Sequence, residues 1–209
     1  KNFTMRINIL DYNCGNIWSI KNIFSYLNIE VEIIKTEKEI INSDCLILPG
    51  DGSFKIIDDI REKRLVEPLN FVANDKKIPI LGICLGMQLF GTKSEETDFS
   101  KKGLNWIEGD LTKFKVNKKI PHIGFNNLIN LKDKGLFKNI NENSKFYFVH
   151  NYFFKTKNHS NVIAETEYEI IFPSVIKKDN IVGTQFHPEK SQNEGIQFIY
   201  NFLKNYNLI

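Results

Sequence analysis

The sequence predicts an α/β fold with a mainly parallel central sheet flanked by helices. In the first half of the chain, short apolar runs alternate with segments of helical periodicity, as they do when crossover helices join parallel strands. Each run ends close to Gly, Pro or Asp, which is typical of buried parallel strands. The predicted strands comprise residues 6–10, 31–35, 45–48 and 78–83.

Two segments have the periodicity of amphipathic helices. In residues 16–27 apolar side chains recur at spacings of three and four, which predicts a helix that packs one face on the sheet; these side chains are Ile17, Ile20, Phe24 and Leu27. Residues 194–206 repeat this pattern near the end of the sequence.

The middle of the chain predicts an additional antiparallel β region. From about residue 103 to residue 183 the apolar runs become shorter and are interrupted by Asn, Lys and Gly. This pattern of short, interrupted apolar runs favours antiparallel strands connected by long loops. The strands expected here comprise residues 111–116, 145–149 and 161–165.

Length and composition narrow the class of protein. With 209 residues, 42% of them hydrophobic, we expect one domain over residues 5–209, with residues 1–4 as a natural extension or a cloning remnant. The 28 basic and 25 acidic residues are spread along the chain, which argues against a nucleic-acid groove. No run is long enough for a membrane helix and no signal peptide is recognisable, so we expect a soluble cytoplasmic protein.

A cysteine follows one of the predicted strands in a distinctive turn. The segment 82–86 reads Gly-Ile-Cys-Leu-Gly, directly after an apolar run and before a helical pattern. This spacing is that of a nucleophile elbow with Cys84 at its tip, where the flanking glycines remove Cβ atoms that would clash. A helix N-terminus there favours thiolate over thiol. The alternative is a buried structural cysteine, and Cys14 and Cys45 carry no such signal.

A cysteine that cleaves an amide needs a general base and a group that orients the base. Among the four histidines, His187 ends a predicted strand and has Glu189 two residues further on. His159 lies in a polar loop, and His122 and His150 flank apolar runs where packed histidines are common. His-Pro-Glu by itself is also compatible with an ordinary loop.

A glycine-rich loop follows the predicted strand 45–48. Its sequence contains Gly50 and Gly52, and open α/β sheets bind ligands beyond the carboxyl ends of their strands. The glycines allow a peptide N–H to approach a substrate oxygen, so this loop and the N–H of Leu85 are candidates for an oxyanion hole. An ordinary Gly-Pro turn is the alternative.

Together these motifs resemble the class I, or triad, glutamine amidotransferases, and among them the glutaminase subunits of imidazole glycerol phosphate synthases. The resemblance extends over nearly the whole chain. The motifs that carry it are residues 11–16 (DYNCGN), 48–52 (LPGDG), 81–88 (LGICLGMQ), 121–126 (PHIGFN), 147–150 (YFVH) and 185–191 (QFHPEKS).

The resemblance implies roles for individual residues. Cys84 is the expected nucleophile, His187 the base and acid, and Glu189 the orienting carboxylate. Four residues are expected to bind the substrate glutamine: Gly50, Gly52, Leu85 and Gln88. Four are expected to face a partner: Tyr147, Lys190, Phe125 and Asn16. We expect no cofactor and no metal ion.

The resemblance also implies a reaction and a partner. Glutamine is hydrolysed to glutamate through a thioester, and the ammonia crosses into a synthase (cyclase) subunit, a (β/α)8 barrel that forms a heterodimer with the glutaminase in histidine biosynthesis. Three departures stand out: Asp51 where a small apolar residue is usual, Phe125 where Trp is common, and Glu169 where Gly is frequent. A carboxylate beside the oxyanion loop opposes negative charge, so Asp51 is expected to face away.

Three alternatives stay open on the sequence. Similar glutaminase subunits serve amidotransferases that build acetamidino groups on surface-polysaccharide sugars. A regulatory or binding module with an inactive site is possible on the same fold, although all three triad positions are filled. A separate cysteine hydrolase or peptidase of similar topology is disfavoured by Gln88 and by the pair Lys190 and Ser191.

Overall fold

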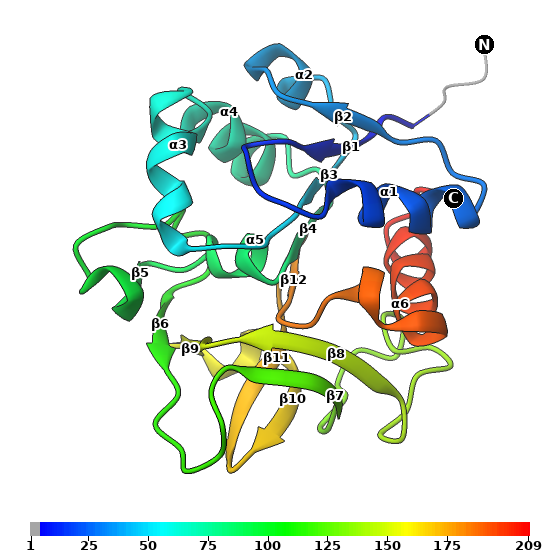
Figure 1. Cartoon of the computed structure of the whole chain (residues 1–209). Helices are drawn as coiled ribbons and strands as arrows, with labels where there is room; N and C mark the ends of the chain where they lie inside the picture. Colours follow the sequence, from blue (N-terminus) through cyan, green and yellow to red (C-terminus); the bar gives the residue numbers. More distant parts are fainter. Residues whose placement is uncertain (1–4) are drawn as a thin grey trace.

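The computed structural model describes residues 5–209, so the extension expected at residues 1–4 lies outside the described part. Its centre is a seven-stranded sheet in the order β10-β11-β12-β4-β3-β1-β2, with a three-stranded sheet (β5-β6-β9) and a two-stranded hairpin (β7-β8) beside it (Figure 1). This architecture confirms the predicted α/β class.

The strands are β1 Ile7–Leu10, β2 Glu32–Ile34, β3 Cys45–Leu48, β4 Ile80–Ile83, β5 Lys93–Ser94, β6 Gly109–Lys113, β7 His122–Asn127, β8 Lys145–His150, β9 Tyr152–Thr156, β10 Val162–Tyr168, β11 Ile170–Lys178 and β12 Ile181–Thr184. The α-helices are α1 Ile17–Tyr26, α2 Glu37–Ile41, α3 Ile57–Glu62, α4 Val66–Asn70, α5 Leu85–Gln88 and α6 Gln192–Asn205. Short helical turns are η1 Phe54–Ile56, η2 Phe71–Asp75, η3 Glu95–Thr97, η4 His159–Asn161 and η5 Pro188–Lys190.

Five strands of the main sheet run parallel, which brings their carboxyl ends to one edge. β1 pairs with β2 and β3, β3 pairs with β4, and β4 pairs with β12, all in parallel register. The segments that follow β1, β3, β4 and β12 therefore leave the sheet side by side. These are the segments in which the sequence motifs predict the site.

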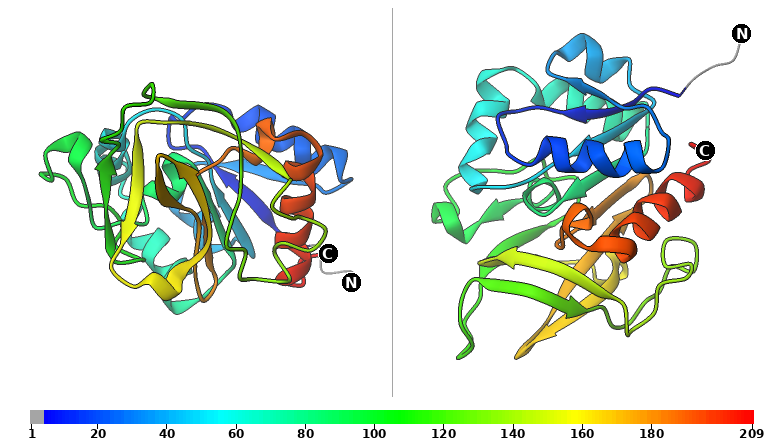
Figure 2. Two further views of the ribbon diagram at one scale, coloured as in Figure 1. Left: turned by 90° about the horizontal axis from the view of Figure 1, so that it is seen from below. Right: turned by 45° about the vertical axis from the view of Figure 1, so that its right-hand side comes forward.

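The two faces of the sheet have separate cores because side chains alternate along each strand. Ile9, Ile47 and Leu81 lie in the core beneath α1 and α6. Leu10 and Leu48 lie in the core beneath α2, α3 and α4. Figure 2 shows α1 and α6 together on one side of the sheet. Residues 5–209 form no helix that combines the length and apolar character needed to cross a bilayer.

The predicted antiparallel region is divided among the three sheets. β10 and β11 extend the main sheet in antiparallel pairing beyond β12. β6 pairs with β9 and β7 pairs with β8, also antiparallel, whereas β5 joins β6 in parallel. Local patterns predict that strands exist here but do not reveal which sheet each one joins, because pairing is a long-range choice.

Element boundaries differ from the prediction by small amounts. The strand expected at residues 111–116 is β6, which begins at Gly109 and ends at Lys113. The sequence predicts a single helix before residue 78, but α2, α3 and α4 also form there. Each has only five or six residues, too few to repeat an apolar period, and α2 is identified instead by a capping box between Thr36 and Glu39.

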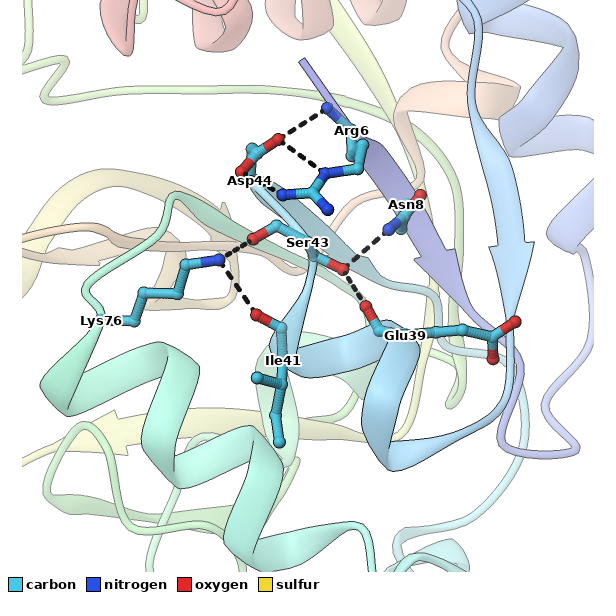
Figure 3. A network of polar contacts seen from close by, with 7 residues as sticks. All are labelled: Arg6, Asn8, Glu39, Ile41, Ser43, Asp44 and Lys76. Atoms are coloured by element: carbon cyan, nitrogen blue, oxygen red, sulfur yellow. Dashed lines mark hydrogen bonds and ion pairs between the residues drawn. The ribbon is translucent and has the colours of Figure 1, made fainter. Parts of the chain in front are cut away.

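A polar network ties the amino ends of β1 and β3 together (Figure 3). Arg6 pairs with Asp44 through its backbone N–H and its guanidinium. Next to this pair, the Asn8 amide donates to Ser43 Oγ at 2.8 Å, and both side chains are buried. Lys76 Nζ donates to the carbonyl of Ser43 at 2.6 Å. The network lies at the amino ends of the strands, whereas the predicted site follows their carboxyl ends.

Replacing Ser43 tests this network. Ser43→Ala leaves the buried Asn8 amide without its acceptor, and Asn8 Oδ1 already lacks a partner among residues 5–209. We expect a loss of about 1–3 kcal/mol in the free energy of unfolding, measured by urea denaturation. The control is Ser25→Ala, whose hydroxyl bonds the Lys21 carbonyl in an exposed position, with a change within about 0.5 kcal/mol. Equal effects of the two variants would contradict this role.

Candidate active site

Cys84 occupies a strained turn between β4 and α5. Its backbone has φ 51° and ψ −105°, a conformation that non-glycine residues rarely adopt. A Cβ on Gly82 would lie 2.4 Å from the Phe90 ring, and a Cβ on Gly86 would lie 2.0 Å from the Leu48 carbonyl oxygen. Only glycine fits at either position, so the flanking glycines are needed to form the turn.

The glycine-rich loop after β3 packs directly against this turn. A Cβ on Gly50 would lie 2.5 Å from both the Ile83 carbonyl oxygen and the Leu85 nitrogen. Leu85 is the first residue of α5, where a helix offers its N–H no internal acceptor. Gly52 has φ +119°, which requires glycine. The loop and the Leu85 N–H thus meet beside Cys84.

His187 and Glu189 form a buried pair beyond the end of β12. His187 Nδ1 lies 2.7 Å from Glu189 Oε1, and each side chain is only 1% exposed. The His187 N–H donates to the Tyr147 carbonyl at 2.9 Å. Ser191 Oγ donates to the His187 carbonyl and accepts from the Tyr147 N–H. These bonds fasten the His187 backbone to β8.

Packing of α6 fixes the turn that carries Glu189. The Pro188 carbonyl lies against Gly195 in α6, where a Cβ would be 1.8 Å from the Pro188 oxygen. Pro188 begins the helical turn η5, and its ring holds φ near the helical value. The Glu189 side chain therefore contacts the His187 imidazole and is shielded from solvent.

The surroundings of His187 favour its charged form. Burial alone lowers the pKa of His187, but negative charge on the Cys84 sulfur and the bond to Glu189 outweigh burial and raise the pKa to about 10. Among the described residues, His187 Nε2 has no hydrogen-bond partner. The imidazole thus keeps Nδ1 on Glu189 and leaves Nε2 as the ring nitrogen for the interaction with Cys84, which also raises the pKa of His187.

Asn16 makes a contact that its sequence position did not predict. Its side-chain Nδ2 donates to Glu189 Oε1 at 2.5 Å, so this oxygen receives bonds from Asn16 and His187 together. Asn16 lies just before α1 with φ 69°, a conformation that asparagine tolerates better than most residues. The sequence assigns Asn16 to a partner surface, whereas the structure directs its amide to Glu189.

A cavity of about 210 Å³ opens beside Cys84. Five of the residues around it come from the predicted site or its loop: Asp51, Gly52, Cys84, Leu85 and Gln88. Gly50 lies behind the Cys84 turn and does not line the cavity. Six further lining residues come from elsewhere: Glu96, Pro121, Val149, His150, Asn151 and Tyr152. Two sequence motifs could have indicated some of them: residues 121–126, which begin with Pro121, and residues 147–150, which contain Val149 and His150.

Over residues 8–206 the chain matches the family model described as glutamine amidotransferase class-I. The chain belongs to this family. The "Imidazole glycerol phosphate synthase subunit HisH" of Leptospira interrogans is 39% identical over 94% of this chain and 98% of that protein. HisH 2 of Methanococcus maripaludis is 43% identical (95% and 98%), and HisH 1 of Campylobacter jejuni strain 81-176 is 42% identical (95% and 99%). Within the family, this amidotransferase is a member of the HisH group.

Solved structures agree on the fold. A structure described as a glutamine amidotransferase superposes with a TM-score of 0.76 at 17% identity, over 96% of this chain and 98% of that chain. A chain in the structure of PurLQS from Thermotoga maritima gives 0.73 at 16% identity, over 97% and 99%. At such identities the likeness establishes the fold, which is the class I amidotransferase fold that the sequence predicts.

Three residues assigned to the partner surface form one cluster on the amidotransferase. The rings of Phe125 and Tyr147 meet edge to face with centroids 5.5 Å apart. Lys190 Nζ lies 5.9 Å from the Tyr147 ring centroid. Phe125 is 48% exposed, so the cluster presents aromatic surface to solvent beside the His187 segment. Asn16 differs from these three because its amide contacts Glu189.

One of the departures from the family pattern has a local explanation. Glu169 has φ 60° in the turn between β10 and β11, a conformation that favours glycine. Its carboxylate accepts bonds from the N–H groups of Asn117 and Lys118 at 2.7 and 2.9 Å, which offsets the backbone strain. Asp51 lines the cavity, and its Oδ2 is 3.7 Å from the position of a Cβ on Gly15. That its carboxylate faces away from the substrate stays a prediction.

The other histidines lie where the sequence places them. His159 is 70% exposed and 3.7 Å from Glu165. His122 and His150 are buried and bonded to each other at 3.1 Å. The part of the chain from residue 5 onward contains no group of three or more His, Cys, Asp or Glu residues able to hold a metal ion.

The raised pKa of His187 predicts a specific pH dependence. In a ¹⁵N NMR titration of the isolated protein, the imidazolium of His187 should persist to a midpoint of about 10. In Cys84→Ala the midpoint should move to lower pH, because burial persists while the negative sulfur is gone. An unchanged midpoint in Cys84→Ala would show that the sulfur does not act on His187.

The same shift links stability to pH. Because the folded pKa of His187 exceeds the unfolded value near 6.5, its contribution is fully present below about pH 6.5 and is lost as pH rises toward about 10. The urea unfolding free energy should thus fall across this range more steeply in the wild type than in His187→Asn. Parallel curves for the two proteins would argue against the shift.

Proposed function

We propose that Cys84, His187 and Glu189 form the catalytic triad of a glutaminase. The observation that carries the proposal is the buried imidazole, held through Nδ1 on Glu189 and made basic by charge on Cys84. A base so placed removes the thiol proton and later delivers a proton to the departing ammonia. Cys84 then attacks the glutamine amide from the cavity that it lines, and His187, which interacts with Cys84, supplies the proton to the nitrogen.

The reaction runs in two steps. The Cys84 thiolate attacks the side-chain amide carbon of glutamine, and the tetrahedral oxyanion is stabilised by the Leu85 N–H and the Gly50–Gly52 loop. His187 protonates the nitrogen, ammonia leaves, and a glutamyl thioester remains. His187 then activates a water molecule, which hydrolyses the thioester to glutamate and restores the thiol.

The substrate pocket follows from the same geometry. Gln88 and Gly52 line the same cavity as Cys84, so a glutamine bound there would contact them next to the nucleophile. The cavity has a volume of about 210 Å³, which accommodates the side chain of a single glutamine. The match to the class I glutamine amidotransferases favours glutaminase chemistry over a peptidase on the same fold.

The released ammonia passes to a separate synthase subunit with a (β/α)8 barrel, in a heterodimer located in the cytoplasm. The named relatives are subunits of imidazole glycerol phosphate synthase, which supports this acceptor and the histidine pathway. The cluster of Phe125, Tyr147 and Lys190 is the proposed contact surface, because it presents the exposed Phe125 ring beside Tyr147 and includes the exposed Lys190, three residues after His187. None of the three named relatives supports sugar amidination.

Substitution of the triad tests the mechanism. Cys84→Ser should abolish glutamate release, whereas Cys14→Ser and Cys45→Ser, at buried positions outside the Cys84 turn, should retain it. Glu189→Gln keeps the shape but favours the wrong His187 tautomer, so activity should fall by about two to four orders of magnitude. Glutamate release by the reconstituted complex is the measurement, with folding checked by thermal melting.

Non-additivity distinguishes a triad from independent groups. If His187 and Glu189 act as one unit, His187→Asn combined with Glu189→Gln should be little worse than His187→Asn alone. Multiplicative losses, or a fully active Glu189→Gln, would exclude this assignment and leave His150, which also lines the cavity, as the next base to test.

Lys190 tests the contact surface separately from the chemistry. Its side chain is exposed and lies over Tyr147 rather than in the cavity. Lys190→Ala should therefore lower the glutamine-dependent rate of the complex at least about fivefold, within the usual range of coupling energies, while synthesis from added ammonia survives. The matched control is Lys204→Ala on α6, whose lysine stacks on Tyr200 in the same way and should change neither rate. A parallel fall of both rates in Lys190→Ala would contradict the assignment.

A further inference from the structure

A continuous run of hydrogen bonds leads to the Cys84 sulfur from strand β7. We call it the polar chain; it extends from Asn126 through His122, His150, the Tyr152 carbonyl and Gln88 to Gln185. At its inner end the Gln185 amide nitrogen lies 3.6 Å from Cys84 Sγ. Gln185 is fully buried and belongs to none of the residues assigned a role above.

The Tyr152 carbonyl determines the direction of the chain on its inner side. A carbonyl oxygen can only accept, and it lies 3.2 Å from Gln88 Nε2. The same Gln88 nitrogen lies 3.2 Å from Gln185 Oε1. With its oxygen bound to Gln88, the Gln185 amide must direct its NH2 group toward the sulfur.

The same carbonyl determines the direction on the outer side. It lies 2.8 Å from His150 Nδ1, which must therefore carry a proton. A neutral His150 then accepts through Nε2 from His122 Nδ1 at 3.1 Å. His122 Nε2 in turn accepts from Asn126 Nδ2 at 3.3 Å.

The part of the polar chain from Asn126 to His150 has the same direction when it is traced from Asn126. Asn126 Nδ2 also donates to the Glu167 carbonyl at 3.0 Å, which fixes the orientation of its amide independently of the histidines. Burial lowers the pKa of His122 to about 4 and that of His150 to about 3, so both rings are neutral near pH 7. A charged ring at either position would have two donors and would break the chain.

We propose that Gln185 is a positioning residue for the Cys84 nucleophile, and that the polar chain keeps its amide nitrogen, rather than its amide oxygen, toward the sulfur. An N–H donor stabilises a thiolate, whereas a carbonyl oxygen at the same place repels it. Since a free amide can turn by 180°, the chain supplies the constraint that excludes the unfavourable orientation. The proposal rests on the nucleophile role proposed for Cys84.

Alkylation of Cys84 measures the effect without turnover. Iodoacetamide reacts with the thiolate, and peptide mass spectrometry separates Cys84 from Cys14 and Cys45. Gln185→Met keeps the length of the side chain but removes the donor, so alkylation of the full chain at pH 7 should be at least about tenfold slower. The control is Gln197→Met, which removes a similar amide bond to Asn201 on α6 and should stay within about twofold. Equal rates for Gln185→Met and the wild type would overturn the proposal.

The pH profile of alkylation separates thiolate stabilisation from blocked access. His187 faces the sulfur, and the buried Tyr12 lies near Cys84 as well; both are present in the wild type and in Gln185→Met, so their effects are common to the two proteins. Gln185→Met should shift the profile to higher pH and reach the wild-type rate at the alkaline plateau. A lowered plateau with an unshifted profile would mean that Gln185 only shapes the entrance, and the proposal would fail.

Histidine tautomers test the direction of the chain in the wild type, even if Gln185→Met does not fold. Long-range ¹H–¹⁵N spectra should show His122 and His150 both protonated at Nδ1 at pH 7. His150 protonated at Nε2 would remove the bond to the Tyr152 carbonyl and overturn the proposal. If Cys84→Ser were to retain glutaminase activity, the nucleophile assignment would fail, while the alkylation and tautomer results would still stand on their own.

Discussion

The strained turn at Cys84 is the constraint on which the rest of the site depends. Its positive φ forces the chain to double back between β4 and α5 in a space that admits only glycine at Gly82, Gly86 and Gly50. β4 lies between β3 and β12 in the sheet. The turn therefore meets the glycine-rich loop on one side and the His187 segment on the other, and all three are held in register by parallel strand pairing.

The arrangement of the three segments brings the buried charges of His187 and Glu189 together with Cys84. His187 and Glu189 are both almost completely buried, and charges in such a place are costly unless they are paired. Glu189 receives bonds from His187 and Asn16, both on Oε1, while its buried Oε2 has no partner among residues 5–209; His187 interacts with Glu189 and with charge on Cys84. The end of β12 thus supplies the imidazole, its carboxylate partner and, at Gln185, an amide for the sulfur.

Much of the fold and the central chemistry could be predicted, because they have local signatures. The apolar runs of β1, β3 and β4 predict a parallel sheet, and the glycines around Cys84 predict its turn. The short helices α2, α3 and α4 were missed, since five or six residues do not display a period. Glu169 illustrates a different limit: its left-handed backbone is compensated by bonds to Asn117 and Lys118, about fifty positions away in the sequence.

By itself the sequence determined the class of the fold and the turn that presents Cys84, because each depends on residues close together in the chain; the pairing of His187 with Glu189 was expected only from the family resemblance. Only the tertiary structure decided that Asn16 bonds Glu189 across 173 positions, and that Gln185 turns its amide nitrogen toward a sulfur 101 positions away. The orientation of a buried polar side chain depends on which acceptors surround it. Those acceptors are brought together by strand order and packing, which no local pattern encodes.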